Sequence, residues 1–334
     1  MHALVYTQPN EVRVQDRPYP EMADGEVIIK IESAGICGSD MHAYHGQDPR
    51  RNPGLVLGHE FAGTVVESRD GSIAVGDRVS GNPSITCGFC DNCLQGRSNL
   101  CSNRTMVGMT RPGAFADYMS IPAVSLIKLP GDLEIDAAAL TEPAATALHA
   151  INLSQRALCR PLQEGRVLIL GGGAIGMLAA LLLKHYGVNQ LALVELNAKR
   201  GQSIRDHVGC DVLDTTKTAL SESAYHLVLD CVGAAATRKA AFSAVKPGGA
   251  IVHIGLQDWA SEIDMRKLTL GEITLMGAFI YTLADMRATV NLLRQGVFGD
   301  LGWVEKRSLA EGPAAFSDLH AGRTAAAKVL LKPN

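Results

Sequence analysis

The sequence lacks the features that mark secretion or binding to nucleic acid. Lysine and arginine total 31 against 34 aspartate and glutamate residues, the net charge is −3, and no block of basic residues occurs. Nucleic acid and anionic membranes attract clustered positive charge, so neither is expected as a partner. The first six residues do not combine a basic segment with a long apolar run. We therefore predict no secretory signal and expect a cytoplasmic location.

Long apolar runs are also missing. The longest stretch without a charged residue, 167–183, contains four glycines and is short for a membrane span, so a strand, a turn and a buried helix explain it better. No internal repeat or low-complexity linker occurs. A chain of 334 residues is too long for one ordinary hydrophobic core, which favours two domains with a cleft between them.

Four of the eight cysteines lie within fifteen residues, in a loop rich in Gly, Asn and Ser: Cys87, Cys90, Cys93 and Cys101. Four thiolates at this spacing can surround one ion tetrahedrally, which predicts a structural zinc site. A site of this kind has no open coordination position, so it stabilises the fold. Reduced surface thiols and an iron–sulfur cluster are the alternatives. The cysteines without ligand spacing are interpreted as core or loop thiols: Cys159, Cys210 and Cys231.

Cys37 stands apart from this cluster, and a lone cysteine is more often a buried hydrophobe than a ligand. Two other segments change the interpretation, Gly58-His59-Glu60 and Thr141-Glu142-Pro143. One thiolate, one imidazole and carboxylates form a mixed site that leaves a coordination position for a substrate oxygen. The sequence by itself does not establish that the three segments meet.

Ser39 and His42 follow Cys37 by two and five residues. A turn or short helix would place this hydroxyl and this imidazole beside a metal bound to Cys37, and that arrangement suits a proton relay to solvent. The alternative is that Ser39 or Asp40 caps a helix and His42 is a hydrogen-bonded surface residue.

The first 130 residues contain short strands and frequent turns, which predicts a β-rich, partly barrel-like unit with strands at 27–31, 63–66, 77–80 and 115–119. From residue 166 on, helical stretches alternate with apolar strands at 167–170, 191–194, 227–229, 250–254 and 273–276. This alternation predicts a doubly wound parallel sheet. A final helix-like stretch from 285, a short helix and an apolar strand at 327–331 complete the chain.

A glycine-rich turn connects the strand 167–170 to the expected helix 174–186, and its sequence is Gly171-x-Gly173-Ala174-Ile175-Gly176. Glu195 ends the next strand, nineteen residues after the last of these glycines. In this context the motif is a dinucleotide-binding fingerprint. The glycines admit the pyrophosphate to the helix N-terminus, and the Glu195 carboxylate accepts hydrogen bonds from the ribose hydroxyls. Since a carboxylate repels a 2′-phosphate, NAD is expected rather than NADP.

With these motifs in this order, the chain resembles the zinc-dependent medium-chain alcohol dehydrogenases, in particular their sorbitol and polyol dehydrogenase branch, over essentially its whole length. The resemblance implies an α/β fold with a β-rich, GroES-like catalytic domain, residues 1–152 and 287–334. A doubly wound Rossmann domain, residues 153–286, would be inserted into it. It also implies a homo-oligomer, a tetramer or a dimer, and a small-molecule alcohol as substrate.

The same resemblance implies roles for individual residues. Cys37 and His59 would bind a catalytic zinc, Glu60 or Glu142 would be a further ligand or hold the zinc-bound water, and Ser39 with His42 would relay the proton. Arg200 would stack on adenine, or else be a solvated helix residue. The residues implied to line the nicotinamide pocket are Ile254, Gly255, Leu256, Phe279 and Ile280.

These observations predict an oxidoreductase that transfers a hydride from a secondary alcohol to NAD and gives a ketone. The alcohol is expected to be a polyol, a sugar alcohol or a sugar acid. The alternative is a threonine-type or phosphorylated-polyol dehydrogenase of the same fold, and a less favoured one is a non-catalytic, zinc-stabilised dinucleotide-binding protein. Sorbitol itself is expected to be a modest substrate. Ala43 and Ile280 stand where sorbitol-oxidising relatives place a tyrosine and an arginine, so two hydrogen-bond donors are lost.

The two ligand sets predict two zinc ions with different roles. Cys37→Ser is expected to abolish turnover with the fold nearly intact. Cys93→Ser is expected to lower thermal stability, because a closed site loses one of its four ligands. Elemental analysis gives the zinc count, and thermal unfolding gives the stability. Equal loss of stability from both substitutions would contradict the division of roles.

Overall fold

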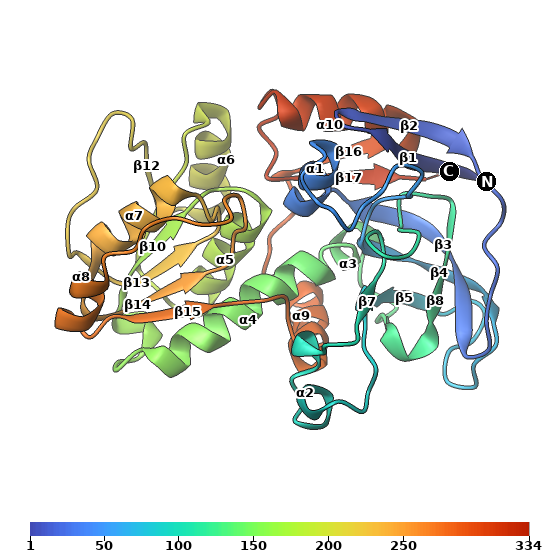
Figure 1. Ribbon diagram of the computed structural model, residues 1–334, viewed down its shortest axis with the longest axis horizontal. Helices are drawn as coiled ribbons and strands as arrows, with labels where there is room; N and C mark the ends of the chain where they lie inside the picture. Colours follow the sequence, from blue (N-terminus) through green and yellow to red (C-terminus); the bar gives the residue numbers. More distant parts are fainter. Residues whose placement is uncertain (334) are drawn as a thin grey trace. The chain divides into compact units, whose positions relative to one another are not determined.

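The computed structural model describes residues 1–333, which form two compact units (Figure 1). The first contains Met1–Glu142, Thr282–Gly296 and the chain from Val304 on, and the second contains Pro143–Tyr281 and Val297–Trp303. Helix α4 (Thr141–Ala157) contains both the first division between these units, after Glu142, and the boundary expected at 152/153. The expected domain boundaries, 152/153 and 286/287, stay a prediction.

The first unit is built on a seven-stranded sheet. Six strands follow one another in the order β16 (Val304–Ser308), β17 (Lys328–Lys332), β3 (Glu26–Gly35), β4 (Glu60–Ser68), β5 (Arg78–Gly81) and β9 (Leu126–Lys128). Strand β8 (Tyr118–Pro122) pairs with β3. All these pairings are antiparallel except that between β16 and β17.

Two small antiparallel strand pairs and five α-helices complete the described part of this unit. The pairs are β1 (His2–Gln8) with β2 (Glu11–Asp16), and β6 (Ser84–Ile85) with β7 (Thr105–Met106). The helices are α1 (Gly38–Tyr44), α2 (Asp91–Leu94), α3 (Ile135–Ala138), α9 (Leu283–Arg294) and α10 (Gly312–His320).

The apolar residues of β3 explain why this strand is central. Ile29 and Ile31 alternate along it, are fully buried and belong to one hydrophobic cluster with Phe61 and Phe115. β-branched side chains at alternate positions favour a strand with one face in the core. The strand expected at 115–119 lies at 118–122 instead, because Phe115 pairs with Leu57 outside the sheet.

The second unit contains a six-stranded sheet, and every strand pair in it is parallel. The order is β12 (Asp211–Leu213), β11 (Gln190–Val194), β10 (Arg166–Leu170), β13 (Tyr225–Asp230), β14 (Val245–His253) and β15 (Thr274–Gly277). Its helices, besides most of α4, are α5 (Ala174–His185), α6 (Ala198–Val208), α7 (Ala235–Ala244) and α8 (Met265–Leu270). The expected doubly wound parallel sheet is confirmed.

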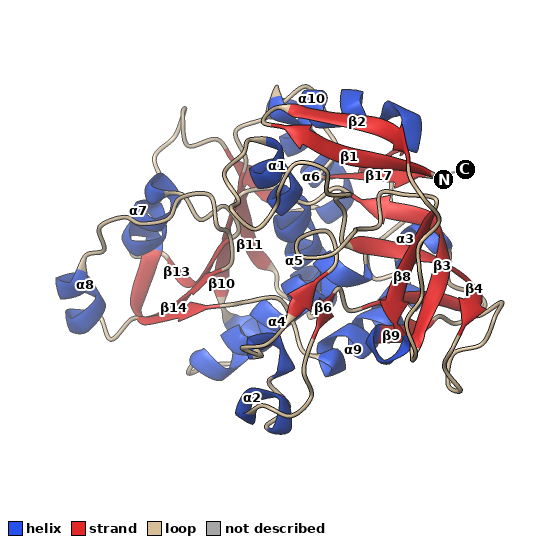
Figure 2. Cartoon of the chain, turned by 45° about the vertical axis from the view of Figure 1, so that its right-hand side comes forward, coloured by secondary structure: helices blue, strands red, loops and turns tan. Residues whose placement is uncertain are grey.

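Helices cover both faces of this sheet (Figure 2). Phe242 of α7 is buried in one cluster with Leu168 of β10. On α5, a Cβ at Gly176 would lie 3.3 Å from the side chain of Ile169. Since neighbouring residues of a strand point to opposite faces, α5 and α7 cover opposite sides of the sheet.

The register of the parallel strands aligns their carboxyl ends at one edge. Leu170 lies opposite Val194 on one side and Asp230 on the other, Asp230 lies opposite His253, and His253 lies opposite Gly277. In open parallel sheets this edge is where ligands bind. The loops that follow these five residues therefore form one row.

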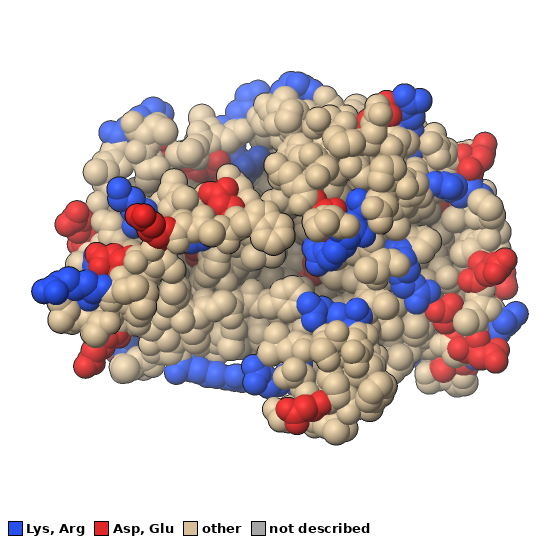
Figure 3. Space-filling view, viewed as in Figure 1, with Lys and Arg blue, Asp and Glu red and all other residues tan. Residues whose placement is uncertain are grey.

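No helix within residues 1–333 is long and apolar enough to cross a membrane. On the face of the molecule drawn in Figure 3, acidic and basic side chains are interspersed.

Candidate functional site

Three potential metal ligands converge in the first unit. Cys37 lies between β3 and α1, and His59 with Glu60 lies at the start of β4. The antiparallel register pairs Gly35 with Glu60, which brings the end of one strand beside the beginning of the other. One ligand atom from each of Cys37, His59 and Glu60 lies within 4.8 Å of the others. Two of the three segments singled out in the sequence thus meet.

The third segment contributes Glu142, which is buried but is not a member of this group among the described residues. Its negative charge is one of the causes that raise the pKa of Lys328. The exchange of ligand roles between Glu60 and Glu142 stays a prediction.

Glu60 lies directly over Gly35. A Cβ built on Gly35 would approach Oε2 of Glu60 to 1.9 Å, a distance that no side chain tolerates. A glycine is required at this position because the carboxylate occupies the space above the backbone.

A lysine neutralises this carboxylate. Nζ of Lys328 lies 2.6 Å from Oε1 and 2.7 Å from Oε2 of Glu60, and it also donates to the carbonyl oxygen of Ile36 at 2.9 Å. Both side chains are almost completely buried. Burial opposes the charge of Lys328, but the charges of Glu60, Cys37 and Glu142 outweigh it and raise its pKa.

His59 is buried beside a second carboxylate. Its Nδ1 atom lies 3.6 Å from Oδ1 of Asp40 and has no hydrogen-bond partner. Burial lowers the pKa of His59, yet the charges of Asp40 and Cys37 raise it well above its ordinary value. The side chains of Cys37, His59 and Glu60 therefore form an environment that favours a positive charge. A thiolate, an imidazole and a carboxylate are ligands that suit zinc. These residues fit a zinc ion.

Helix α1 carries the two expected relay residues, Ser39 and His42, both partly buried. Asp40 on the same helix accepts a hydrogen bond from the backbone N–H of Cys37 at 3.0 Å. Asp40 therefore caps helix α1, in agreement with the helix cap that the sequence offered as an alternative. Oγ of Ser39 accepts a hydrogen bond from Nη2 of Arg51 at 3.2 Å.

The four clustered cysteines form a second potential metal site. The distance between the Sγ atoms of Cys90 and Cys93 is 3.5 Å, as is that between Cys87 and Cys101. Both are far beyond a disulfide bond and close to the edge of about 3.8 Å in a ZnS₄ tetrahedron with 2.3 Å bonds. Backbone N–H groups, with that of Phe89 first, lower the pKa of Cys87 to about 6, which favours the thiolate that a metal requires.

In the second unit, the glycine-rich turn follows the end of β10. Gly171 has φ +94°, a backbone conformation that suits glycine. A Cβ at Gly176 would lie 1.9 Å from the carbonyl oxygen of Gly171, so helix α5 can pack on the turn only without a side chain there. A Cβ at Gly173, the N-cap of α5, would meet nothing within 4 Å. This side of the helix N-terminus has room for a phosphate group.

Glu195 follows β11 and faces this turn. Its Oε2 accepts from the N–H of Gly172 at 3.1 Å and from Nη1 of Arg200 at 3.3 Å, and its Oε1 accepts from the N–H of Asn197 at 2.7 Å. The contact between Arg200 and Glu195 shows that Arg200 is not an isolated solvated residue. The remaining residues expected to contact the cofactor follow β14 and β15 in the row described above: Ile254, Gly255, Leu256, Phe279 and Ile280.

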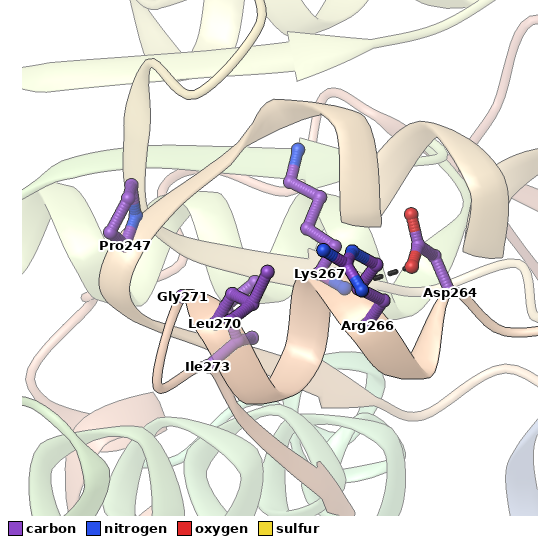
Figure 4. A pocket seen from close by; sticks show the side chains of 7 residues that line it. All are labelled: Pro247, Asp264, Arg266, Lys267, Leu270, Gly271 and Ile273. Carbon is purple, nitrogen blue, oxygen red and sulfur yellow. Dashed lines mark hydrogen bonds between the residues drawn. The ribbon is translucent and has the colours of Figure 1, made fainter.

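One surface hollow, of about 380 Å³, lies elsewhere in the second unit, beside α8. In Figure 4 the backbone N–H of Lys267 donates to Asp264, which caps this helix, and Leu270 and Pro247 form the apolar wall. None of its lining residues is an expected site residue.

Sequence reasoning missed two residues of this region, Lys328 and Arg51. For Lys328 a signal existed, since a lysine inside the apolar strand 327–331 must find a counter-ion if it is buried. For Arg51 no signal existed, because it stands in a polar loop beside another arginine and only the fold buries it.

Comparison with known proteins agrees with this arrangement. A family model described as alcohol dehydrogenase GroES-like domain matches residues 23–131, and a model described as zinc-binding dehydrogenase matches residues 174–295. The L-threonine 3-dehydrogenase of Pectobacterium carotovorum subsp. carotovorum (strain PC1) is 32% identical over 294 residues. This match covers 84% of the chain and 82% of the relative.

Two solved structures are similar over nearly the full length. A protein of Sinorhizobium meliloti 1021, assigned as a zinc-binding dehydrogenase and bound to NADP, is 31% identical with a TM-score of 0.89, covering 99% of both chains. The 2R,3R-butanediol dehydrogenase of Bacillus subtilis is 26% identical with a TM-score of 0.88, covering 100% of this chain and 99% of that one. The chain belongs to the zinc-dependent medium-chain alcohol dehydrogenases, and its cofactors are zinc and a nicotinamide dinucleotide.

The buried pair of Glu60 and Lys328 gives a stability prediction. Lys328→Met removes the only hydrogen-bonded cation of Glu60 among the described residues and is expected to cost about 3–5 kcal/mol of unfolding free energy. Lys332→Met on the same strand is the control. Its partner Asp136 is partly exposed and keeps Lys306, so the expected cost is at most about 1 kcal/mol.

Urea unfolding of the purified variants measures both effects. Adding Glu60→Gln to Lys328→Met is expected to restore part of the loss, because the buried charge is then removed. Similar losses for Lys328→Met and Lys332→Met would contradict this account.

Proposed function

We propose that this dehydrogenase oxidises a secondary alcohol to a ketone and transfers the hydride to NAD. The observation that carries the proposal is the convergence of Cys37, His59 and Glu60, a mixed donor set that can leave a coordination position for a substrate oxygen. The dinucleotide fingerprint at the edge of the parallel sheet supports it.

Cys37 and His59 would hold the catalytic zinc, and Glu60 or Glu142 would complete its ligands or hold its water. A zinc ion bound there supplies Lewis acidity, which lowers the pKa of an alcohol hydroxyl toward neutrality. Cys87, Cys90, Cys93 and Cys101 would hold a second zinc with a structural role. The hydride chemistry is that of the nicotinamide.

Ser39 and His42 would carry the proton. Oγ of Ser39 receives the proton from the substrate hydroxyl as it gives its own proton toward His42, whose imidazole passes it to solvent. Both residues stand on α1, directly after Cys37, which supports this order of transfer.

The choice of NAD rests on Glu195. Its carboxylate accepts hydrogen bonds from the N–H groups of Gly172 and Asn197, which place it beside the turn where the adenosine ribose would lie. A 2′-phosphate would meet this charge. The Sinorhizobium neighbour is bound to NADP, so a direct comparison of the two cofactors is required.

A polyol or sugar acid is the first candidate substrate, on the resemblance of the motifs around Cys37 and Glu142. The likeness to a butanediol dehydrogenase supports a hydroxyl-rich secondary alcohol. A threonine-type amino alcohol is the second candidate, because curated relatives at 32% identity are L-threonine 3-dehydrogenases. The 3-hydroxyl of threonine is also a secondary alcohol, so both candidates require the same reaction.

A substrate panel tests the proposal. NADH formation is measured with sorbitol, xylitol, galactitol, a sugar acid, L-threonine, 2,3-butanediol and ethanol. We expect activity on secondary alcohols, with sorbitol a modest substrate. Activity confined to ethanol would overturn the proposal, and a strong preference for L-threonine would select the second candidate. Binding of zinc and NAD without any turnover would favour a non-catalytic binding protein.

Glu195→Ser is expected to relax the preference for NAD over NADP, because it removes the repulsion toward the 2′-phosphate while Lys199 and Arg200 remain nearby. The ratio of kcat/KM values for NAD and NADP measures the effect. Glu222→Ser, a change at an exposed glutamate outside the turn, is the control and is expected to leave the ratio unchanged. A wild-type enzyme that used NADP as efficiently as NAD would contradict the argument.

We also propose a homo-oligomer, a dimer or a tetramer. The edge strand β15 of the parallel sheet exposes Leu275, and unpaired backbone groups on an edge strand favour pairing with a second copy. The molar mass in solution gives the number of copies.

A further inference from the structure

Arg51 is buried, and every N–H group of its guanidinium donates a hydrogen bond. Nε donates to the carbonyl oxygen of Gly108 at 2.9 Å, and Nη1 donates to the carbonyl oxygen of Ser39 at 2.6 Å and to Oδ2 of Asp48 at 3.0 Å. Nη2 donates to Oγ of Ser39 at 3.2 Å and to Oδ1 of Asp40 at 3.5 Å. Arginine has five N–H donors, and here each has an acceptor.

One of these acceptors, the carboxylate of Asp40, connects Arg51 to the candidate metal ligands. Asp40 accepts from the N–H of Cys37 through Oδ2, and its Oδ1, which faces Arg51, also lies 3.6 Å from Nδ1 of His59. The guanidinium thus holds the carboxylate that contacts both the thiol segment and the imidazole.

A second acceptor, the carbonyl oxygen of Gly108, connects Arg51 to the backbone next to His59. Gly108 packs so closely on the backbone before His59 that a Cβ on it would lie 2.5 Å from the carbonyl oxygen of Gly58. Arg51 is therefore bonded both to helix α1, through Ser39, and to the loop that supports His59.

We propose that Arg51 is the positioning residue of the catalytic centre, which fixes Asp40 behind His59 and orients the hydroxyl of Ser39 for proton transfer. The second part rests on the proposed function, and the first part does not. No contact of Arg51 with substrate is required. It acts through Asp40 and Ser39.

The hydroxyl of Ser39 has one donor and two acceptor positions. Nη2 of Arg51 occupies one acceptor position, so the hydroxyl proton points away from the guanidinium and toward a different acceptor. Arg51 thereby gives Ser39 a direction of proton transfer.

Arg51→Lys is the informative variant. Lysine keeps the buried positive charge but has three donors on one nitrogen, so it cannot reach all five acceptors. Two controls lie in the same loop. Arg50→Lys alters an exposed arginine paired with Asp48, and Asp48→Asn weakens the anchor of the loop without touching Ser39 or Asp40.

The first measurement is the rate at which zinc leaves the Cys37 centre for a chelator, followed with a colorimetric zinc indicator. Residues that orient metal ligands change metal affinity about 10–100-fold when they are replaced. We expect Arg51→Lys to release this zinc about tenfold faster, with release from the four-cysteine site unchanged. Arg50→Lys and Asp48→Asn are expected to resemble the wild type.

The second measurement is a double-mutant cycle on kcat with Ser39→Ala and Arg51→Lys. We expect Arg51→Lys to lower kcat about tenfold with little change in KM for the alcohol. In the Ser39→Ala background it is expected to lower kcat much less, because the hydroxyl that it orients is gone. Fully additive effects would overturn the orientation of Ser39.

The outcomes separate the alternatives. Zinc release from Arg51→Lys at the wild-type rate, or equally fast release from Asp48→Asn, would overturn the positioning of the centre and make Arg51 an anchor of the loop. A wild-type protein without alcohol activity would contradict the proposed function, and the zinc measurement would still decide the role of Arg51. If Arg51→Lys does not fold, Arg51→Gln takes its place in the zinc measurement: release about tenfold faster than from the wild type supports the inference, and release at the wild-type rate overturns it.

Discussion

The first unit buries two carboxylates beside a thiol and an imidazole. Each of these carboxylates is paired with one buried cation. Glu60 is held by Lys328, and Asp40 is held by Arg51. An unpaired buried charge is strongly destabilising, so neither acid is tolerable without its partner. The four residues come from three strands or helices and one loop, which ties the parts of the candidate centre together.

The second unit treats its carboxylates differently. Asp230 accepts hydrogen bonds from the N–H groups of Val232 and Gly233, and Glu195 accepts from those of Gly172 and Asn197. These acids lie at the carboxyl ends of parallel strands, where turns expose unpaired N–H groups. Backbone donors hold each carboxylate in place, and each also lies beside a partly buried side chain that can carry positive charge, Arg200 for Glu195 and His253 for Asp230. Glu195 is the carboxylate on which the proposed preference for NAD rests.

The substrate remains the least constrained element of the protein. The metal ligands and the fingerprint describe a reaction that many alcohols can undergo, because fold and zinc chemistry do not by themselves specify the carbon skeleton. The resemblance to sorbitol-oxidising relatives implies a tyrosine and an arginine where this chain has Ala43 and Ile280, and both changes would remove a polar side chain. Relatives named for threonine and for butanediol fit the same reaction.

Local signals let the sequence by itself predict the family, the parallel sheet and both ligand sets. Three of these local signals are the spacing of the four cysteines, the glycine turn before helix α5 and the acid after β11. Each reflects what the nearby backbone requires, so it can be recognised in the sequence. Most of the expected strands lie within a few residues of their predicted places. The structure contains one shift, at 115–119, because Phe115 pairs with Leu57, a partner far away in the sequence.

Only the tertiary structure decided how the charges are matched. Lys328 reaches Glu60 across 268 residues, and Arg51 reaches Gly108 across 57. No local pattern encodes such partners, because the pairing arises when β17 joins β3 and when the loop after α1 folds inward. The sequence determined which chemical groups are present, and long-range packing determined which of them are neutralised, oriented and brought together.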